Sequence, residues 1–254
     1  MKILFIGDVY GQPGIDYLSD NLKQLKNLYT PNLIIVNGEN ASNGRGINKK
    51  IYKHFMSLGI HVITMGNHTW KNKDIYNFID DSNLIRPIND HETVGTGYKI
   101  VKYNDKRVLV INALGRIFID ETLKCPFKAV EEILEINQGQ YDYSLLDFHA
   151  EATSEKIALA HHFDGKIDVI VGTHTHVQTN DNRQLPKGSL TITDVGMTGA
   201  LNGVIGVDKD VIIDRFINGY SLPNKIALGK KQLNGVIIDL TKDKKSIEKI
   251  HLSE

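Results

Sequence analysis

The chain has 254 residues, 41% of them hydrophobic, which is enough for one sizeable α/β domain with a buried core. Its 30 basic and 30 acidic residues give a formal net charge of zero, which argues against a broad basic surface for nucleic acid or anionic membrane but allows a local basic patch. The single cysteine, Cys125, excludes an intrachain disulfide and a cysteine-rich zinc site, so any metal needs nitrogen and oxygen ligands.

No apolar run is long enough to span a bilayer, and the apolar stretch at the N-terminus is too short for a signal peptide. We therefore expect a soluble cytoplasmic protein with no membrane partner.

The first 80 residues repeat a pattern of apolar strand, polar loop and amphipathic helix. The predicted strands cover residues 3–6, 32–36 and 61–65; the helices carry Ile15 to Leu28, then Ile51, Phe55 and Leu58 after an N-cap at Asn48, then Ile75, Phe78 and Ile79. This alternation is typical of a parallel sheet with helical crossovers.

The remainder is less regular but continues as a mixture of strands and helices. We predict an antiparallel pair at 98–101 and 107–112, strands at 141–148, 167–171, 190–193, 225–228, 233–240 and 246–252, and helices at 127–136, 153–163 and 208–217. No repeat or linker divides the chain, so residues 1–254 are predicted to form a single domain. The high strand count favours two sheets, and the expected fold class is α/β, a two-sheet sandwich flanked by helices.

The stretch from Val171 to His176 has the clearest functional pattern. A buried strand ends at Gly172, and two histidines follow, His174 and His176, with one residue between them. On an extended backbone, residues two apart point to the same side, so the two imidazoles could converge on one metal ion. Taken alone, the pair fits polar loop histidines equally well.

Other predicted strands end in residues of the same kind. Eight metal-binding or proton-transferring side chains follow strand ends: Asp8, Glu39, Asn40, Asn67, His68, His149, His174 and His176. Ligands of open α/β sheets bind beyond the carboxyl ends of the strands, so these side chains are expected on one rim of the fold.

Most of the eight have an ordinary structural interpretation when taken singly. Asp8 could be an N-cap, Asn40 and Asn67 could be turn residues, and His149 a core histidine, whereas Glu39 has no usual turn role. Their joint occurrence favours a site. We interpret the remaining histidines as surface or structural residues: His54, His61, His91, His161, His162 and His251.

Carboxylate, amide and imidazole ligands together suit divalent ions such as Mn²⁺, Fe²⁺ or Zn²⁺. Seven ligands are too many for one ion, but two ions that share one carboxylate would use them all. Such a pair catalyses in-line displacement at phosphorus, by activating a water and neutralising the phosphoryl oxygens.

The order of these motifs resembles the calcineurin-like metallophosphoesterases. The matching segments, over residues 1 to about 200, are Gly7-Asp8, Gly38-Glu39-Asn40, Gly66-Asn67-His68, His149 and Gly172-Thr173-His174-Thr175-His176. Two departures stand out: Tyr10 replaces the histidine two residues after the aspartate, and Glu39-Asn40 replaces the bridging aspartate. With GENASNGRG, ITMGNHTW, DFHAEATSEK, GTHTHVQTNDNR and ITDVGMTG, these departures resemble the YmdB branch of the superfamily.

This resemblance implies the calcineurin-like metallophosphoesterase fold and a role for each residue. One metal would be held by Asp8, Asn40 and His176, and the other by Asn67, His149 and His174, with Glu39 bridging them. His68 would be the general acid that protonates the leaving oxygen. The branch contains phosphodiesterases, with 2′,3′-cyclic nucleotides among their substrates and iron or manganese at the paired site. Two divalent ions are therefore expected, iron or manganese before zinc.

Two other functions fit the sequence less well. A binuclear amidohydrolase also has a His-x-His motif, but there it follows the first barrel strand, whereas here it comes late. A metal-dependent regulator or RNA-binding protein with little turnover would have no evident need of an acid such as His68.

The substrate-binding residues are not assigned by the sequence. Arg45, Arg183 and Lys187 could contact a phosphate, although solvent is the usual surrounding of such side chains. The expected partner is a small phosphodiester or cyclic nucleotide. RNA and a second copy of the chain in a homo-oligomer are further candidates, and the sequence does not assign the oligomeric state.

Overall fold

In the computed structural model, residues 1–219, 223–241 and 245–254 are described. The strands are β1 (Lys2–Ile6), β2 (Asp8–Val9), β3 (Leu33–Asn37), β4 (Val62–Thr64), β5 (Leu84–Ile85), β6 (Tyr98–Tyr103), β7 (Lys106–Leu114), β8 (Tyr143–His149), β9 (Val169–Thr173), β10 (Arg183–Gln184), β11 (Leu190–Ile192), β12 (Met197–Ala200), β13 (Lys231–Asp239) and β14 (Ser246–Ser253). The helices are α1 (Gly11–Tyr29), α2 (Lys49–Ser57), the 3₁₀ helix η1 (Lys73–Asn77), α3 (Pro126–Ile136), α4 (Thr153–His162) and α5 (Lys209–Asn218).

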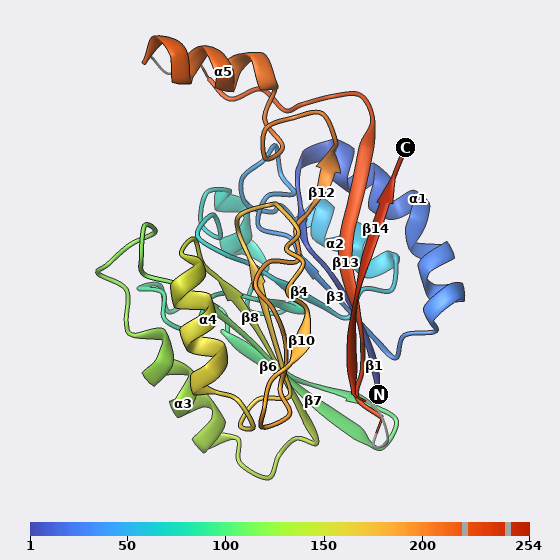
Figure 1. Ribbon diagram of the computed structural model, residues 1–254, viewed down its shortest axis with the longest axis vertical. Helices are drawn as coiled ribbons and strands as arrows, with labels where there is room; N and C mark the ends of the chain where they lie inside the picture. The colour runs from blue at the N-terminus through green and yellow to red at the C-terminus, as the bar shows by residue number, and fades with distance from the viewer. Residues whose placement is uncertain (220–222, 242–244) are drawn as a thin grey trace.

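Two sheets pack face to face, with helices on both outer sides (Figure 1). The larger sheet has the order β2-β12-β13-β1-β3-β4-β5, with β14 paired to β13, and the smaller has the order β10-β11-β9-β8-β7-β6. Helices α1 and α2 cover the larger sheet, and α3 and α4 cover the smaller one. The predicted fold class, a two-sheet α/β sandwich flanked by helices, is confirmed.

The alternation of side chains along β1 shows why its uninterrupted apolar run suits this position. Leu4 and Ile6 pack in the core under α1 and α2, whereas Ile3 and Phe5 pack in the core between the two sheets. Successive residues of a strand point to opposite faces, so a strand covered on both sides must be apolar at every position.

Parallel pairing brings the strand ends to one edge of each sheet. In the larger sheet β1, β3, β4 and β5 are parallel neighbours, and in the smaller sheet β7, β8, β9 and β11 are. His149, the last residue of β8, is in register with Thr173, the last residue of β9. The polar residues that follow these strands are thereby placed at a common rim.

Two predicted elements are wrong. The helix expected at Ile75 to Ile79 is only the short 3₁₀ helix η1, because Phe78, with φ −151°, leaves the helical region of backbone space. The strand expected at 225–228 is absent from the described residues: Ile226 makes one isolated bridge to Val207, and Leu228 points to solvent with 72% of its surface exposed.

Helix α5 projects from the body of the molecule (Figure 1), and only Ile212 of its residues is buried. No helix in the described part of the chain is long and apolar enough to cross a membrane.

Candidate metal centre

The structure brings all eight predicted site residues together at the rim formed by both sheets. Asp8 begins β2 directly after β1, Glu39 and Asn40 follow β3, and Asn67 and His68 follow β4. His149 ends β8, and His174 and His176 follow β9. Asp8, Glu39, Asn40, His149 and His176 are buried, and Asn67, His68 and His174 are partly exposed.

Glu39 lies at the centre of the cluster, with only 1% of its surface exposed. Its Oε1 atom is 3.3 Å from both His149 Nε2 and His68 Nδ1, and its Oε2 accepts a hydrogen bond of 3.0 Å from the backbone N–H of His68. A single carboxylate therefore faces donors from both sheets.

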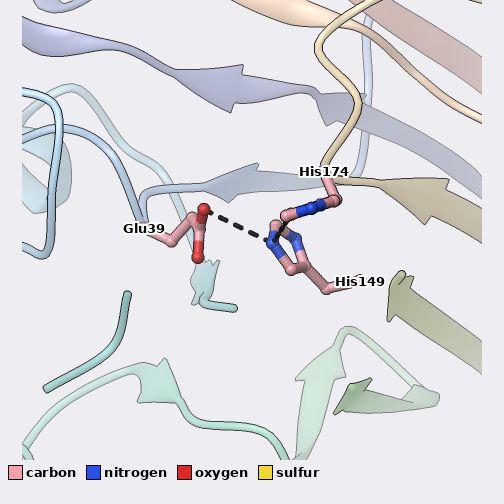
Figure 2. A group of neighbouring side chains, drawn as sticks. All are labelled: Glu39, His149 and His174. Atoms are coloured by element: carbon pink, nitrogen blue, oxygen red, sulfur yellow. Dashed lines mark hydrogen bonds and ion pairs between the residues drawn. The ribbon is translucent and has the colours of Figure 1, made fainter. Parts of the chain in front are cut away.

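Two groups of possible metal ligands share this carboxylate. One consists of Glu39, His149 and His174, and the other of Asp8, Glu39 and His176; within each group the ligand atoms lie within 4.8 Å of one another. Figure 2 shows the first group, with the Glu39 carboxylate facing the neighbouring rings of His149 and His174. His149 Nε2 is 3.0 Å from His174 Nδ1. This arrangement fits a pair of cations with one bridging ligand.

Two amides border these groups. Asn67 Oδ1 is 3.1 Å from His149 Nε2, so its oxygen already faces the first group. Asn40 Nδ2 is 2.8 Å from Glu39 Oε1 and 3.1 Å from His176 Nε2, and its Oδ1 is 2.9 Å from His68 Nδ1. Only the oxygen of an amide binds a hard cation. As a ligand, Asn40 would therefore turn its amide by half a rotation.

Asp8 supplies an independent test of whether a cation fits. Its Oδ2 accepts a hydrogen bond of 3.0 Å from the backbone N–H of His174 and lies 3.2 Å from His176 Nε2. Its Oδ1 is buried and has no hydrogen-bond partner among the described residues. A buried carboxylate oxygen left unpaired is costly, and a divalent cation is its natural partner.

Outer hydrogen bonds orient two of the imidazoles. The Thr173 hydroxyl donates to Asp147 Oδ1 at 2.7 Å and is 2.9 Å from His149 Nδ1, so the Nδ1–H donates to Thr173 and Nε2 faces Glu39. His176 Nδ1 donates to the Ile205 carbonyl at 2.8 Å, which likewise directs Nε2 to Asp8. Partners of this kind are usual behind histidine ligands.

The charged groups of the cluster shift one another's pKa values. Burial would raise the pKa of the Glu39 carboxyl, but His149 and His68 hold it well below its usual value. Burial disfavours a charged His149, yet Glu39 raises the pKa of that imidazole to about 9. Burial and His149 lower the pKa of His174 to about 3. A cation that binds here would displace the proton of His149, since imidazole binds metal in its neutral form.

The predicted conformation of the His-x-His segment is wrong. Strand β9 ends at Thr173, and His174 and His176 have φ values of 103° and 66°, in the left-handed region. The two rings consequently serve different groups, His174 the first and His176 the second. Such backbone angles cost about 1–3 kcal/mol per residue outside glycine and persist only where surrounding contacts enforce them.

A buried ion pair that the sequence did not single out supplies those contacts. Asp194 Oδ2 accepts a hydrogen bond of 3.0 Å from the backbone N–H of Thr175 and lies 2.7 Å from Lys156 Nζ. Lys156 and Asp194 lie 38 residues apart, and nothing in the sequence indicates that they pair. Asp147 is different, because a charged residue inside the apolar run of β8 can be recognised in the sequence as unusual.

Gly66 allows the rim to close around the cluster. A Cβ atom at this position would collide with the side chains of Glu39 and His149. The glycine before Asn67 and His68 is thus required by the close approach of the backbone to the donors.

A cavity of about 390 Å³ opens over the cluster, lined by Glu39, Asn40, His68, His174 and His176, and further by Tyr10, Arg45, Glu151, Asn224 and others. Tyr10, at the position of the missing histidine, packs edge-on against His176 with ring centroids 5.6 Å apart. Glu151 Oε2, which was not predicted, is 3.0 Å from His174 Nε2. Arg45 lines this cavity, whereas Arg183 and Lys187 line others.

The two-sheet fold is that of the metallophosphoesterases. The NAD nucleotidase of Haemophilus influenzae has the same fold, with a TM-score of 0.60 and 13% identity over 100% of this chain and 55% of that one. This likeness concerns the fold alone.

The chain belongs to the YmdB-like protein family, whose model matches residues 4–252. It is 48% identical to a 2′,3′-cyclic-nucleotide 2′-phosphodiesterase of Bacillus subtilis over 100% of this chain and 98% of that one. A solved structure described as a novel phosphatase, from Mycoplasma pneumoniae, is 37% identical and superposes with a TM-score of 0.93 over 100% of this chain and 94% of that one. The resemblance found in the motifs is confirmed, and the chain is a phosphoric ester hydrolase.

Proposed function

We propose that this protein is a dinuclear metal-dependent phosphodiesterase that hydrolyses 2′,3′-cyclic nucleotides, with His68 as the general acid. The observation that carries the proposal is the position of Glu39, whose carboxylate belongs to two groups of metal ligands at once. The name of the B. subtilis relative supports the substrate class.

Asp8, Asn40 and His176 would hold one cation and Asn67, His149 and His174 the other, with Glu39 bridging. The contacts that support this division are those of Glu39 with His149 and of Asp8 with His176. Nitrogen and oxygen donors of this mixture suit divalent ions such as Mn²⁺, Fe²⁺ or Zn²⁺. The resemblance of the motifs puts iron or manganese before zinc. When bound, the pair would supply an activated water and neutralise charge on the phosphoryl oxygens.

His68 would protonate the leaving oxygen. It lines the cavity over the cluster, yet belongs to neither group of ligands. Its Nδ1 lies 3.3 Å from Glu39 Oε1, which leaves Nε2 as the ring atom available for proton transfer.

The test is hydrolysis of 2′,3′-cyclic AMP by the protein loaded with Mn²⁺, Fe²⁺ or Zn²⁺, beside the variant His68→Ala. We expect wild-type turnover, and a loss of 10²-fold or more in kcat for the variant with two ions per chain retained. His161→Ala, an exposed histidine of α4, is the matched control. Absence of hydrolysis with every metal would contradict the proposal and favour a metal-dependent regulator; loss of the metals in His68→Ala would contradict the acid role.

A further inference from the structure

A second cavity adjoins the metal centre. It has a volume of about 430 Å³, and Arg45 and His68 line both this cavity and the one over the donor cluster. On the far side of His68 its walls include Trp70, Lys71 and His91. A ligand held at the metal centre can therefore extend past His68 into a space of its own.

Trp70 is fixed as part of the wall of this second cavity. Its indole stacks on Tyr76, with ring centroids 5.1 Å apart and planes inclined by 25°, and its Nε1–H donates to Asp90 Oδ2 at 2.8 Å. The one polar atom of the indole is thus already bonded. What Trp70 offers a ligand is rigid aromatic surface, to which a nucleobase can stack.

Positive charge lies along the same cavity. Arg45 and Lys71 are exposed cations that line it. Two carboxylates also line it but are engaged with neighbours: Asp90 with Trp70, and Asp120 with the hydroxyl of Thr122 at 2.6 Å. An aromatic surface beside two cations suits a ligand that combines a base with phosphate.

We propose that the second cavity is a nucleoside subsite, in which the base stacks on Trp70 and Arg45 and Lys71 receive a phosphate on the 5′ side. The inference rests on the proposed function, and on His68 in particular. In a 2′,3′-cyclic nucleotide the leaving oxygen belongs to the ribose. A general acid that protonates this oxygen therefore stands next to the ribose, and the base continues to the side of His68 away from the donors.

The first test uses fluorescence, because Trp70 is the single tryptophan of the chain. The Mn²⁺-loaded protein is titrated with adenosine 3′-phosphate and, separately, with glycerol 3-phosphate. We expect saturable quenching by the adenosine compound and none by the glycerol compound. Absence of quenching by adenosine 3′-phosphate, or equal quenching by both, would overturn the subsite whatever the enzyme hydrolyses.

The second test separates binding from chemistry. Trp70→Leu should raise KM for 2′,3′-cyclic AMP about tenfold with little change in kcat, and should leave kcat/KM for the baseless glycerol 1,2-cyclic phosphate near that of the wild type. An equal loss on both substrates, or no loss on either, would refute base stacking. If the wild type hydrolyses neither compound, the proposed function is wrong. The fluorescence titration then decides by itself whether the second cavity binds a nucleoside.

The proposed contact with the 5′-phosphate can be tested by comparing substitutions of Lys71 and Lys73. Both are exposed lysines of one segment, but Lys71 lines the cavity, whereas Lys73 Nζ lies over the Tyr76 ring at 5.3 Å. Lys71→Ala should raise KM severalfold for 2′,3′-cyclic AMP that carries a 5′-phosphate, and less for the compound without it. Lys73→Ala should behave as the wild type. Equal effects of the two variants would refute the 5′-phosphate contact.

Discussion

The ammonium group of Lys156 lies 2.7 Å from Oδ2 of Asp194, and both side chains are buried. The same carboxylate accepts hydrogen bonds from the backbone N–H groups of Thr175 and Gly196. The Gly196 carbonyl in turn accepts from the backbone N–H of Asp8 at 3.1 Å. One ion pair is thereby connected to both the histidine loop and the strand that carries Asp8, so we regard Asp194 as a positioning residue.

Breaking this pair should cost stability and metal affinity together. Asp194→Leu leaves the Lys156 ammonium buried and unpaired, which is expected to cost about 3–5 kcal/mol in urea unfolding. The double variant Lys156→Met/Asp194→Leu removes both charges and should recover much of that stability. It still lacks the acceptor for the Thr175 N–H. Its metal affinity, measured by equilibrium dialysis, should therefore stay at least tenfold below that of the wild type. Wild-type affinity in the double variant would contradict the positioning role.

Removal of the bridging carboxylate should empty both metal positions. In Glu39→Gln, two neighbouring cations would repel each other without the negative carboxylate that lies between them. We therefore expect fewer than one ion per chain by elemental analysis. Glu151→Gln is the control, because this more exposed carboxylate contacts only His174 among the predicted ligands. Two ions per chain in Glu39→Gln would exclude the bridging role.

A methyl group at position 66 should displace two of the proposed metal ligands and lower the metal affinity. Gly66→Ala places Cβ against Glu39 and His149, so we expect at least a tenfold loss of metal affinity. Gly139→Ala provides the contrast: its Cβ meets no atom within 4 Å, but φ is +77°. That variant should lose about 1 kcal/mol of stability and keep its metals. Similar metal affinity in the two variants would contradict the close-packing argument.

The pH dependence of stability should contain a contribution from Asp181. Burial would raise the pKa of this carboxyl, but hydrogen bonds from Thr193 and Thr179 hold it below its usual value of 3.8. A pKa lowered by folding stabilises the protein above the unfolded-state pKa, and this stabilisation is lost as pH falls through the folded-state pKa.

Asp181→Asn should therefore lose about 1 kcal/mol at pH 7, because the carboxylate is partly exposed and its hydrogen bonds are correspondingly weakened. The difference from the wild type should shrink as urea unfolding is repeated below pH 4. Asp105→Asn, with a side chain 81% exposed, should show no such trend. A difference for Asp181→Asn that grows as pH falls would contradict the assignment.

The positions of the donors could be predicted because each one follows a buried apolar run. Glu39 and His149 come at the ends of β3 and β8, and parallel pairing places such ends at one rim whatever the loops do. The layers of the fold followed from the same runs, since the strands of both sheets are apolar on two faces.

The details that could not be predicted depend on contacts between distant segments. The left-handed backbone of His174 and His176 is held by Asp194, which lies 18 residues beyond His176, and no local pattern encodes that bond. Trp70 lines a cavity whose other lining residues include four beyond position 110: Leu114, Ile119, Asp120 and Leu123. At 225–228 the apolar residues matched a strand, but within the described part of the chain this segment pairs only through the isolated bridge of Ile226 to Val207.

The donors come from both sheets: Asp8, Glu39 and Asn67 from the larger one, and His149 and His174 from the smaller. Neither layer alone carries all of the proposed metal ligands. An early folding intermediate with only one sheet formed would accordingly capture no cation pair, and loading would follow docking of the layers. Once bound, the ions would link two sheets that otherwise contact each other through apolar side chains. Removal of the ions by a chelator would therefore lower the stability of the packing between the sheets.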